Sequence, residues 1–244
     1  ALKPAEHDLR RAVGLPIDAV TVDYEGREHV PDAATLRALA TEHRVRLTTP
    51  VRADGYDPLG DDGLLDAVPP DVGRVLVAGH PAYLTEEERE RAVAPRFRAA
   101  READAEAWVG TEGVERLALA AGGTQYELLS GTTRRDVRAL RAAGFDGGVA
   151  LYAPTVLSDD EDAVLDAVGA YVARRRPVAR ALPDDAATDA TATGRAREVL
   201  SAAARDYALV GTVDEVAERV RALREAGVDA VVGYPAAGLD DVRE

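Results

Sequence analysis

The stretch 205–235, RDYALVGTVDEVAERVRALREAGVDAVVGYP, decides the fold. Within it, Val216, Val220 and Leu223 recur at positions i, i+4 and i+7, and charged residues fill the opposite face. This spacing predicts an amphipathic α-helix over residues 214–226, with one face turned toward a core.

Both ends of this helix carry sequence signals, and a strand follows it. Thr212 and Glu215 form a T-x-x-E capping box, and Gly227 is the expected stop. The run 228–233, VDAVVG, is too short for a helix and rich in β-branched residues. It predicts a buried strand, parallel to its neighbours and covered on both faces. A helix, a glycine and a buried strand form the closing unit of an α/β fold.

The same alternation of strand and helix runs through the rest of the chain. The predicted strands are 1–4, 17–24, 45–51, 74–79, 105–109, 125–129, 148–152 and 228–233. The predicted helices are 6–13, 32–43, 63–68, 85–102, 114–121, 132–143, 158–175, 195–207 and 214–226. The segment 1–4, ALKP, reads as the tail of a strand whose beginning is missing, and the absence of Met at position 1 agrees with this.

Eight βα units in a chain of 244 residues predict an α/β fold, a single (β/α)8 TIM barrel over residues 1–244. A doubly wound open sheet is the rival, although nothing like G-x-G-x-x-G follows the first secure strand. The segment 181–194 is rich in Ala, Asp and Thr without apolar periodicity, and it predicts a mobile loop.

Composition excludes several classes of function. The chain has no Cys, so thiol catalysis, disulfides and Cys-based zinc sites are ruled out. Asp and Glu number 44 against 30 Lys and Arg, a net charge of −14, and Lys3 is the single lysine. Such an acidic, arginine-rich chain resembles cytoplasmic proteins of salt-loving archaea, and it argues against nucleic-acid binding. No signal peptide or membrane-spanning run is visible, so we expect a cytoplasmic protein.

Two segments carry a family resemblance. The segment 207–233, YALVGTVDEVAERVRALREAGVDAVVG, looks like the C-terminal end of the bacterial-luciferase-like superfamily, and 144–174, GFDGGVALYAPTVLSDDEDAVLDAVGAYVAR, resembles an earlier strand and helix of it. That superfamily contains flavin-dependent monooxygenases and reductases that use the deazaflavin coenzyme F-420, among them methylenetetrahydromethanopterin reductase. The resemblance implies a shortened barrel of luciferase-like type, because members are usually longer and this chain has compressed loops in its middle.

In a barrel the working residues follow the carboxyl ends of the strands. His80, in the sequence GHP, is the histidine at such a position. It could act as a general acid or base or bond to a flavin carbonyl, and the alternative is a histidine bonded to a neighbouring loop.

Asp23 and Glu25 flank Tyr24 at the end of another predicted strand, so both carboxylates face one side. They could raise each other's pKa and supply a general acid, or they could form a salt bridge to Arg27 or Arg52. No ligand spacing supports a metal site, and none is predicted.

Ser130, Gly131 and Thr132 follow a strand and open a helix, where N–H groups and the helix dipole suit a phosphate. In the luciferase-like family the equivalent loop receives the coenzyme phosphate. The alternative is an ordinary helix cap formed by Thr132. Tyr152, at the end of the next strand, is a further candidate contact for the coenzyme.

Three hypotheses for function follow. The first is a luciferase-like oxidoreductase that transfers hydride with coenzyme F-420 or FMN to a small-molecule substrate, as a homodimer. The second is a non-catalytic barrel of the same descent that has lost its coenzyme and serves binding or dimerisation. The third is a TIM-barrel enzyme that acts on a phosphorylated small molecule through the loop 130–132.

Overall fold

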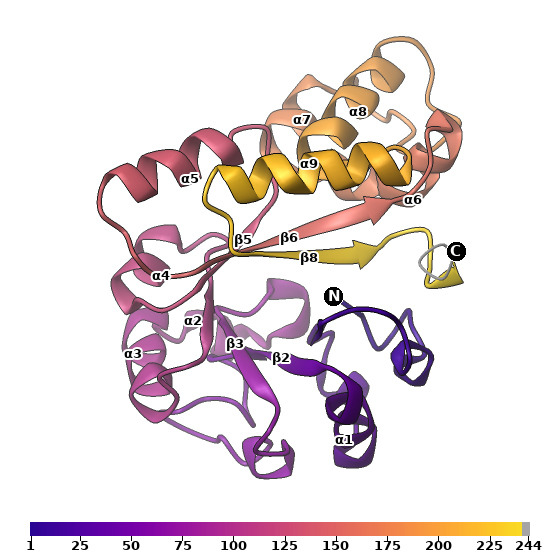
Figure 1. The fold of residues 1–244 in the computed structure, drawn as a ribbon. Helices are drawn as coiled ribbons and strands as arrows, with labels where there is room; N and C mark the ends of the chain where they lie inside the picture. The colour runs from indigo at the N-terminus through magenta and orange to yellow at the C-terminus, as the bar shows by residue number, and fades with distance from the viewer. Residues whose placement is uncertain (241–244) are drawn as a thin grey trace. The chain divides into compact units, whose positions relative to one another are not determined.

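The computed structural model describes residues 1–240 and divides into two compact units. The first unit comprises Ala1–Glu127 with Gly147–Ala150, and the second comprises Leu128–Asp146 with Leu151–Glu244. In both units parallel strands alternate with helices, so the fold class is α/β, as predicted (Figure 1).

The first unit contains the first strands of the sheet and the helices between them. Its strands are β1 (Ala19–Val22), β2 (Arg44–Pro50), β3 (Gly73–Val77), β4 (Trp108–Gly110) and β5 (Gln125–Leu128). Its α-helices are α1 (Ala33–Glu42), α2 (Glu86–Glu90), α3 (Val93–Ala103) and α4 (Glu115–Ala121). Its 3-10 helices are η1 (Leu9–Ala12), η2 (Arg27–His29), η3 (Leu65–Ala67) and η4 (Pro81–Tyr83).

The second unit contains the longest helices. Its strands are β6 (Val149–Val156), whose first two residues belong to the first unit, β7 (Leu209–Val210) and β8 (Ala230–Pro235). Its helices are α5 (Thr133–Ala142), α6 (Glu161–Ala173), α7 (Arg176–Ala181), α8 (Gly194–Tyr207) and α9 (Val213–Glu225). In hydrogen-bonding order the strands run from β1 to β7, and β8 pairs with β6.

Each unit has its own apolar clusters. In the first unit, Leu76 and Val109 project from β3 and β4 against Phe97 of α3 and Ala118 of α4, and all four are buried. In the second unit, Leu165 of α6 packs with Leu200 of α8. Burying side chains of this size contributes about 1.5–3 kcal/mol each, so these clusters hold the helices onto the strands.

The stretch that predicted the fold has the expected ends. Thr212 Oγ1 accepts a hydrogen bond from Glu215 N, and the Glu215 carboxylate accepts one from Thr212 N, which completes the capping box of α9. Gly227 follows the helix with φ of +110°, a conformation that favours glycine.

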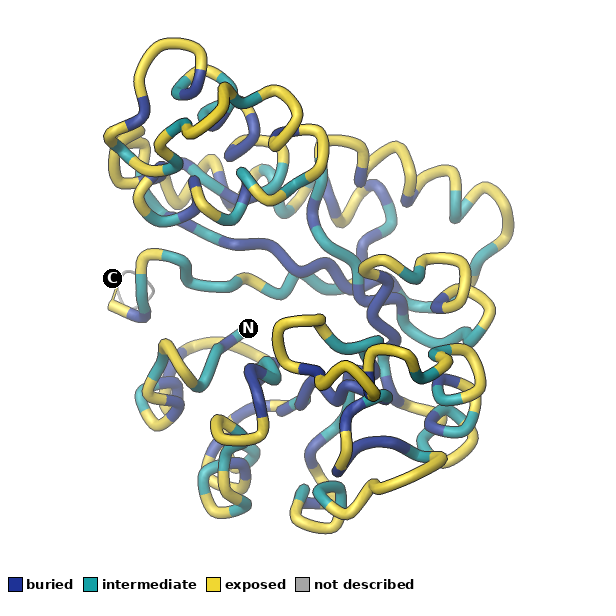
Figure 2. The backbone as a smooth tube through the Cα atoms, turned by 180° about the vertical axis from the view of Figure 1, so that it is seen from behind, coloured by how far each residue is buried: buried dark blue, intermediate teal, exposed yellow. Residues whose placement is uncertain are grey.

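β8 differs from its prediction. It spans Ala230–Pro235 and is half-buried along most of its length, whereas β6 is almost entirely buried (Figure 2). The helices of the second unit lie on one side of β6 and β8 (Figure 1). Those helices therefore cover one face of β8, and the prediction of a fully buried strand was wrong.

The predicted helix 85–102 is two helices, α2 and α3, separated by Arg91 and Ala92. Pro95 explains the break, because it has no N–H for the carbonyl of Arg91, and its ring would collide with that carbonyl in a continuous helix. Arg91 has an extended backbone, with ψ of 133°, and its side chain turns toward the loop after β2.

Two short elements also differ. The predicted strand 1–4 is reduced to one bridge, in which Leu2 N donates to Thr21 O at 2.7 Å and Asp23 N donates to Leu2 O at 2.8 Å. β7, only two residues long, lies between α8 and α9 where no strand was predicted.

The segment 181–194, predicted to be mobile, contacts α6 in the structure. Ala192 is buried in the α6–α8 cluster, and Ala190 N donates to Asp166 Oδ1 at 2.9 Å. Gly169 of α6 lies so close to the carbonyl of Thr188 that a Cβ would come within 2.2 Å of that oxygen. The mobility of this segment in solution stays a prediction.

Candidate functional site

Asp23 follows β1 and carries the carboxyl group with the most altered acidity in the first unit. Its side chain is half-buried and forms no hydrogen bond or ion pair among residues 1–240. Burial raises the pKa of Asp23 from 3.8 to about 6, and the nearby ammonium groups of Ala1 and Lys3 oppose that rise. The Glu25 carboxylate raises the pKa further, as the sequence suggested, but burial is the main cause. Asp23 can therefore exchange a proton near neutral pH.

Glu25, the second predicted acid, is tied to the backbone. Its side chain is buried, and Oε2 accepts a hydrogen bond from Ala5 N at 3.0 Å. Within the described residues it forms no salt bridge to Arg27 or Arg52. This contact anchors the N-terminal segment to the end of β1, which is a structural task.

His80 follows β3 through a turn at Gly79, where φ is +92°. Its Nδ1 accepts a hydrogen bond from Ala82 N at 3.2 Å and caps the 3-10 helix η4. A neutral ring with Nδ1 as acceptor carries its hydrogen on Nε2, so the tautomer follows from this contact. The ring is exposed, and Nε2 has no partner among residues 1–240. His80 is thus bonded within its own loop, two residues along the chain, and not to a neighbouring loop, while its Nε2–H remains available within the described residues.

Three tyrosines form an aromatic cluster after the first three strands. The ring of Tyr24 lies edge-on to those of Tyr56 and Tyr83, with centroids 5.7 and 6.3 Å apart, and Tyr83 lies 5.8 Å from His80. Burial raises the pKa of Tyr24, and it raises that of Tyr56 to about 12. These hydroxyl groups are therefore neutral donors at ordinary pH. Of these three residues, only Tyr24 was predicted from the sequence, although Tyr56 and Tyr83 also follow strands.

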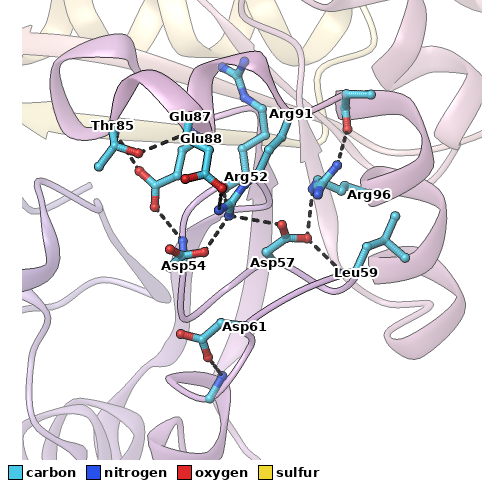
Figure 3. Close-up of polar contacts among 12 residues, drawn as sticks. Arg52, Asp54, Asp57, Leu59, Asp61, Thr85, Glu87, Glu88, Arg91 and Arg96 are labelled. Atoms are coloured by element: carbon cyan, nitrogen blue, oxygen red, sulfur yellow. Dashed lines mark hydrogen bonds and ion pairs between the residues drawn. The ribbon is translucent and has the colours of Figure 1, made fainter.

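An ionic network fixes the loop after β2 (Figure 3). The Asp57 side chain is 1% exposed, and its two oxygens contact Arg96 Nε at 2.8 Å and Arg91 Nη1 at 3.2 Å. Arg91 Nη1 also lies 2.6 Å from Asp54 Oδ1. This network was not predicted from the sequence, because its partners are more than 30 residues apart along the chain.

A buried carboxylate joins this loop to α2. Glu88 completes the capping box with Thr85, and its other oxygen accepts from Asp54 N at 2.7 Å (Figure 3). The carboxylates of Asp57 and Glu88 are therefore saturated by the protein itself. Both hold the loops in place and offer no open position for a ligand.

In the second unit, Ser130, Gly131 and Thr132 precede α5. Thr132 stands at the N-cap position without a capping bond, and Ser130 N donates instead to Thr133 Oγ1 at 2.9 Å. Among residues 1–240 the N–H groups of Gly131 and Arg134 find no acceptor. The alternative of an ordinary cap by Thr132 is therefore not what the structure contains.

A carboxylate lies beside this loop. A Cβ on Gly131 would come within 2.8 Å of Asp206 Oδ1, from the end of α8. The Asp206 side chain is exposed and carries no hydrogen bond among the described residues. The loop thus combines two available N–H groups, the hydroxyl groups of Ser130 and Thr132, and an opposing negative charge.

Tyr152, the remaining predicted contact, lies within β6 and is 8% exposed. Its ring stacks on Tyr234 of β8 at 6.2 Å with an interplanar angle of 15°. Such an offset pair stabilises the β6–β8 pairing by about 0.5–1.5 kcal/mol beyond its buried area.

Residues 1–240 contain no group of three or more His, Asp or Glu side chains placed to hold a metal ion. Over the same residues, none of the helices combines the length and apolar character that a membrane span requires.

Comparisons with known proteins place the fold. A family model matches residues 1–242. An F-420-dependent secondary alcohol dehydrogenase, solved with an F-420–acetone adduct, matches with a TM-score of 0.60 and 13% identity, over 93% of this chain and 87% of its own. The coenzyme F-420-dependent tetrahydromethanopterin reductase from Methanopyrus kandleri matches with a TM-score of 0.62 and 14% identity, over 99% and 93%. No curated protein matches the chain. The fold is thus of the luciferase-like TIM-barrel type, as predicted.

Proposed function

The chain belongs to the family of unknown function DUF7388. We propose that it is a luciferase-like oxidoreductase that transfers hydride with coenzyme F-420 or FMN. The observation that carries the proposal is its structural likeness, over nearly the whole chain, to two F-420-dependent oxidoreductases. A coenzyme of this kind supplies the hydride chemistry, and the protein binds and orients it.

The loop before α5 is the proposed contact for the coenzyme phosphate. Available N–H groups at Gly131 and Arg134 point to an anion, and the hydroxyl groups of Ser130 and Thr132 add donors. Asp206 opposes an anion, but its exposed side chain can rotate into solvent. Tyr152 is proposed as an aromatic contact for the same coenzyme.

Asp23 and His80 are the proposed proton-transfer residues of the first unit. Asp23 retains a proton to about pH 6 and can transfer it, whereas the Nε2–H of His80 can donate a hydrogen bond to a substrate or coenzyme. Glu25, the third predicted catalytic residue, is proposed to support them by fixing the backbone beside Asp23.

The test is a titration of the full chain with F-420 and with FMN in molar salt, before any variant is made. Binding of either supports the proposal, and absence of binding at millimolar concentration overturns it. Gly131→Leu should then weaken binding more than Gly131→Ala, because φ at this position tolerates a side chain and only bulk differs. Asp206→Asn should tighten binding, since it removes an opposing charge.

A specific observation favours a second candidate, the non-catalytic barrel. The buried carboxylates of Asp57, Glu88 and Glu25 are all bonded to the protein, and Asp206 lies against the phosphate loop. If neither coenzyme binds to the wild type or to Asp206→Asn, this candidate takes first place.

The setting of the protein is also a proposal. The acidic composition supports a cytoplasmic protein adapted to high salt, acting on a small molecule and not on nucleic acid. We expect a homodimer, which sedimentation in molar salt measures directly.

A further inference from the structure

We infer that Arg52 is the positioning residue of His80. The contacts between Arg52 and the segment before His80 do not depend on any activity, whereas their importance for turnover rests on the proposed function. Arg52 lies two residues after β2, whereas His80 lies three residues after β3, so this contact joins the carboxyl ends of two neighbouring strands.

The guanidinium group of Arg52 donates its hydrogen bonds to backbone carbonyl groups. Nε donates to Ala78 O at 2.6 Å, Nη2 donates to Gly79 O at 3.1 Å, and Nη1 donates to Arg89 O at 2.7 Å. Within residues 1–240 it has no carboxylate partner, unlike its neighbours Arg91 and Arg96 in Figure 3. Its donors are thus directed at the two residues before His80 and at the end of α2.

The turn that carries His80 depends on these bonds. Gly79 has φ of +92°, and the side chains of Leu84 and Pro50 pack against it. Among the described residues, Arg52 is the group that donates hydrogen bonds to the carbonyl oxygens of Ala78 and Gly79. Without it, two carbonyl groups on one side of the turn lose their partners and the turn can change direction.

The ring of His80 is held from the other side. Nδ1 accepts from Ala82 N, which leaves Nε2–H as the group presented to a ligand. Arg52 fixes the backbone before the ring, and Ala82 fixes the ring itself. The two contacts together set both the tautomer of His80 and the direction of its Nε2–H.

A matched variant separates positioning from stability. Arg96 belongs to the same loop network and pairs with the buried carboxylate of Asp57, but among residues 1–240 it donates no hydrogen bond to residues 78–80. Arg96→Met should lower stability by leaving a buried charge with fewer partners, without moving His80. Arg52→Met should move His80.

The experiment uses the full chain labelled with ¹⁵N, with the His80 signals assigned by their loss in His80→Gln. The readouts are the ¹⁵N chemical shifts of the two ring nitrogens and the rate of carbethoxylation of His80, neither of which needs a coenzyme. We expect the wild type to show the Nε2–H tautomer. Arg52→Met should shift toward a mixture of tautomers and change the carbethoxylation rate, while Arg96→Met retains the wild-type values.

Unchanged His80 signals in folded Arg52→Met, or equal changes in Arg96→Met, would overturn the inference. If Arg52→Met does not fold, Arg52→Lys decides by the same criterion, because one ammonium group cannot reach three carbonyls in fork geometry. Where a coenzyme binds, Arg52→Met should lower kcat by roughly tenfold, less than the 10²–10⁴-fold typical of losing a general acid or base. Failure of coenzyme binding would overturn the proposed function and leave the ¹⁵N result standing.

Discussion

Replacing Asp23 with Asn should change the pH dependence of stability. Burial raises the pKa of Asp23 from 3.8 to about 6, so folding favours the protonated carboxyl group. The protein is then most stable, with respect to this group, below the unfolded pKa. That stability is lost as the pH rises from about 4 to 6, and the full cost of the buried charge is present at pH 7.

The magnitude follows from the two pKa values. At about 1.36 kcal/mol per pH unit, the difference between 3.8 and about 6 corresponds to about 3 kcal/mol. Because the side chain is partly exposed, about 2 kcal/mol is the more realistic figure. Asn has the shape of the protonated Asp side chain without its charge. Asp23→Asn should therefore be more stable than the wild type by about 2 kcal/mol at pH 7 and nearly equal to it at pH 4.

The assay is urea unfolding of both proteins at fixed molar salt, at intervals from pH 4 to pH 8. The difference between the two free energies of unfolding cancels the other carboxylates that titrate in this range. A difference that stays constant with pH, or a wild type that is the more stable protein at pH 7, would refute the reasoning.

Three further predictions concern the rest of the chain. The net charge of −14 predicts that the melting temperature rises between low and molar salt, because screening shortens to ~3 Å at 1 M; a flat or falling temperature contradicts this. Gly169→Ala should destabilise the protein by about 1–3 kcal/mol and speed proteolysis within 182–193, because its Cβ would meet the Thr188 carbonyl at 2.2 Å; a more stable variant with an intact loop opposes it. Asp57→Asn should cost about 3 kcal/mol, measured by urea unfolding, because Arg91 and Arg96 lose their shared carboxylate; a loss below 1 kcal/mol would count against a buried ion pair.

Local signals in the sequence predicted much of the fold. The capping box of α9 and the glycine after it involve residues within a few positions of one another, so the sequence displays them directly. Pro95 was equally visible and would have divided the predicted helix 85–102, had its missing N–H been considered. β7 could not be predicted in this way, because two residues are too few to show a period.

The candidate site was less accessible to sequence reasoning. The strand-end rule found Asp23, Glu25 and His80, but it could not tell which carboxylate the protein would bind to itself. Asp57 lies in a Gly-, Asp- and Pro-rich loop that reads as solvent-exposed, yet it is buried between two arginines. Whether such a carboxylate is exposed or is buried in an ion pair depends on tertiary contacts, which a local sequence pattern does not show. The capping role of His80 was readable, since proline follows it at the first position of η4.

Asp57 and Asp23 are aspartates of the same unit with two different roles, one in ordering a loop and the other as a candidate for proton transfer. Asp57 is the more deeply buried of the two, and its two oxygens contact the guanidinium groups of Arg91 and Arg96, so it orders the loop after β2. Asp23 forms no ion pair with a guanidinium group in the part of the chain that the structure describes, and burial makes its charged form costly, so its proton is retained to about pH 6. Burial raises the pKa of Asp23 more than the nearby ammonium groups of Ala1 and Lys3 lower it, which suits a group that binds and releases a proton near neutral pH. That balance separates Asp23, as a candidate for proton transfer, from the carboxylates that maintain the fold.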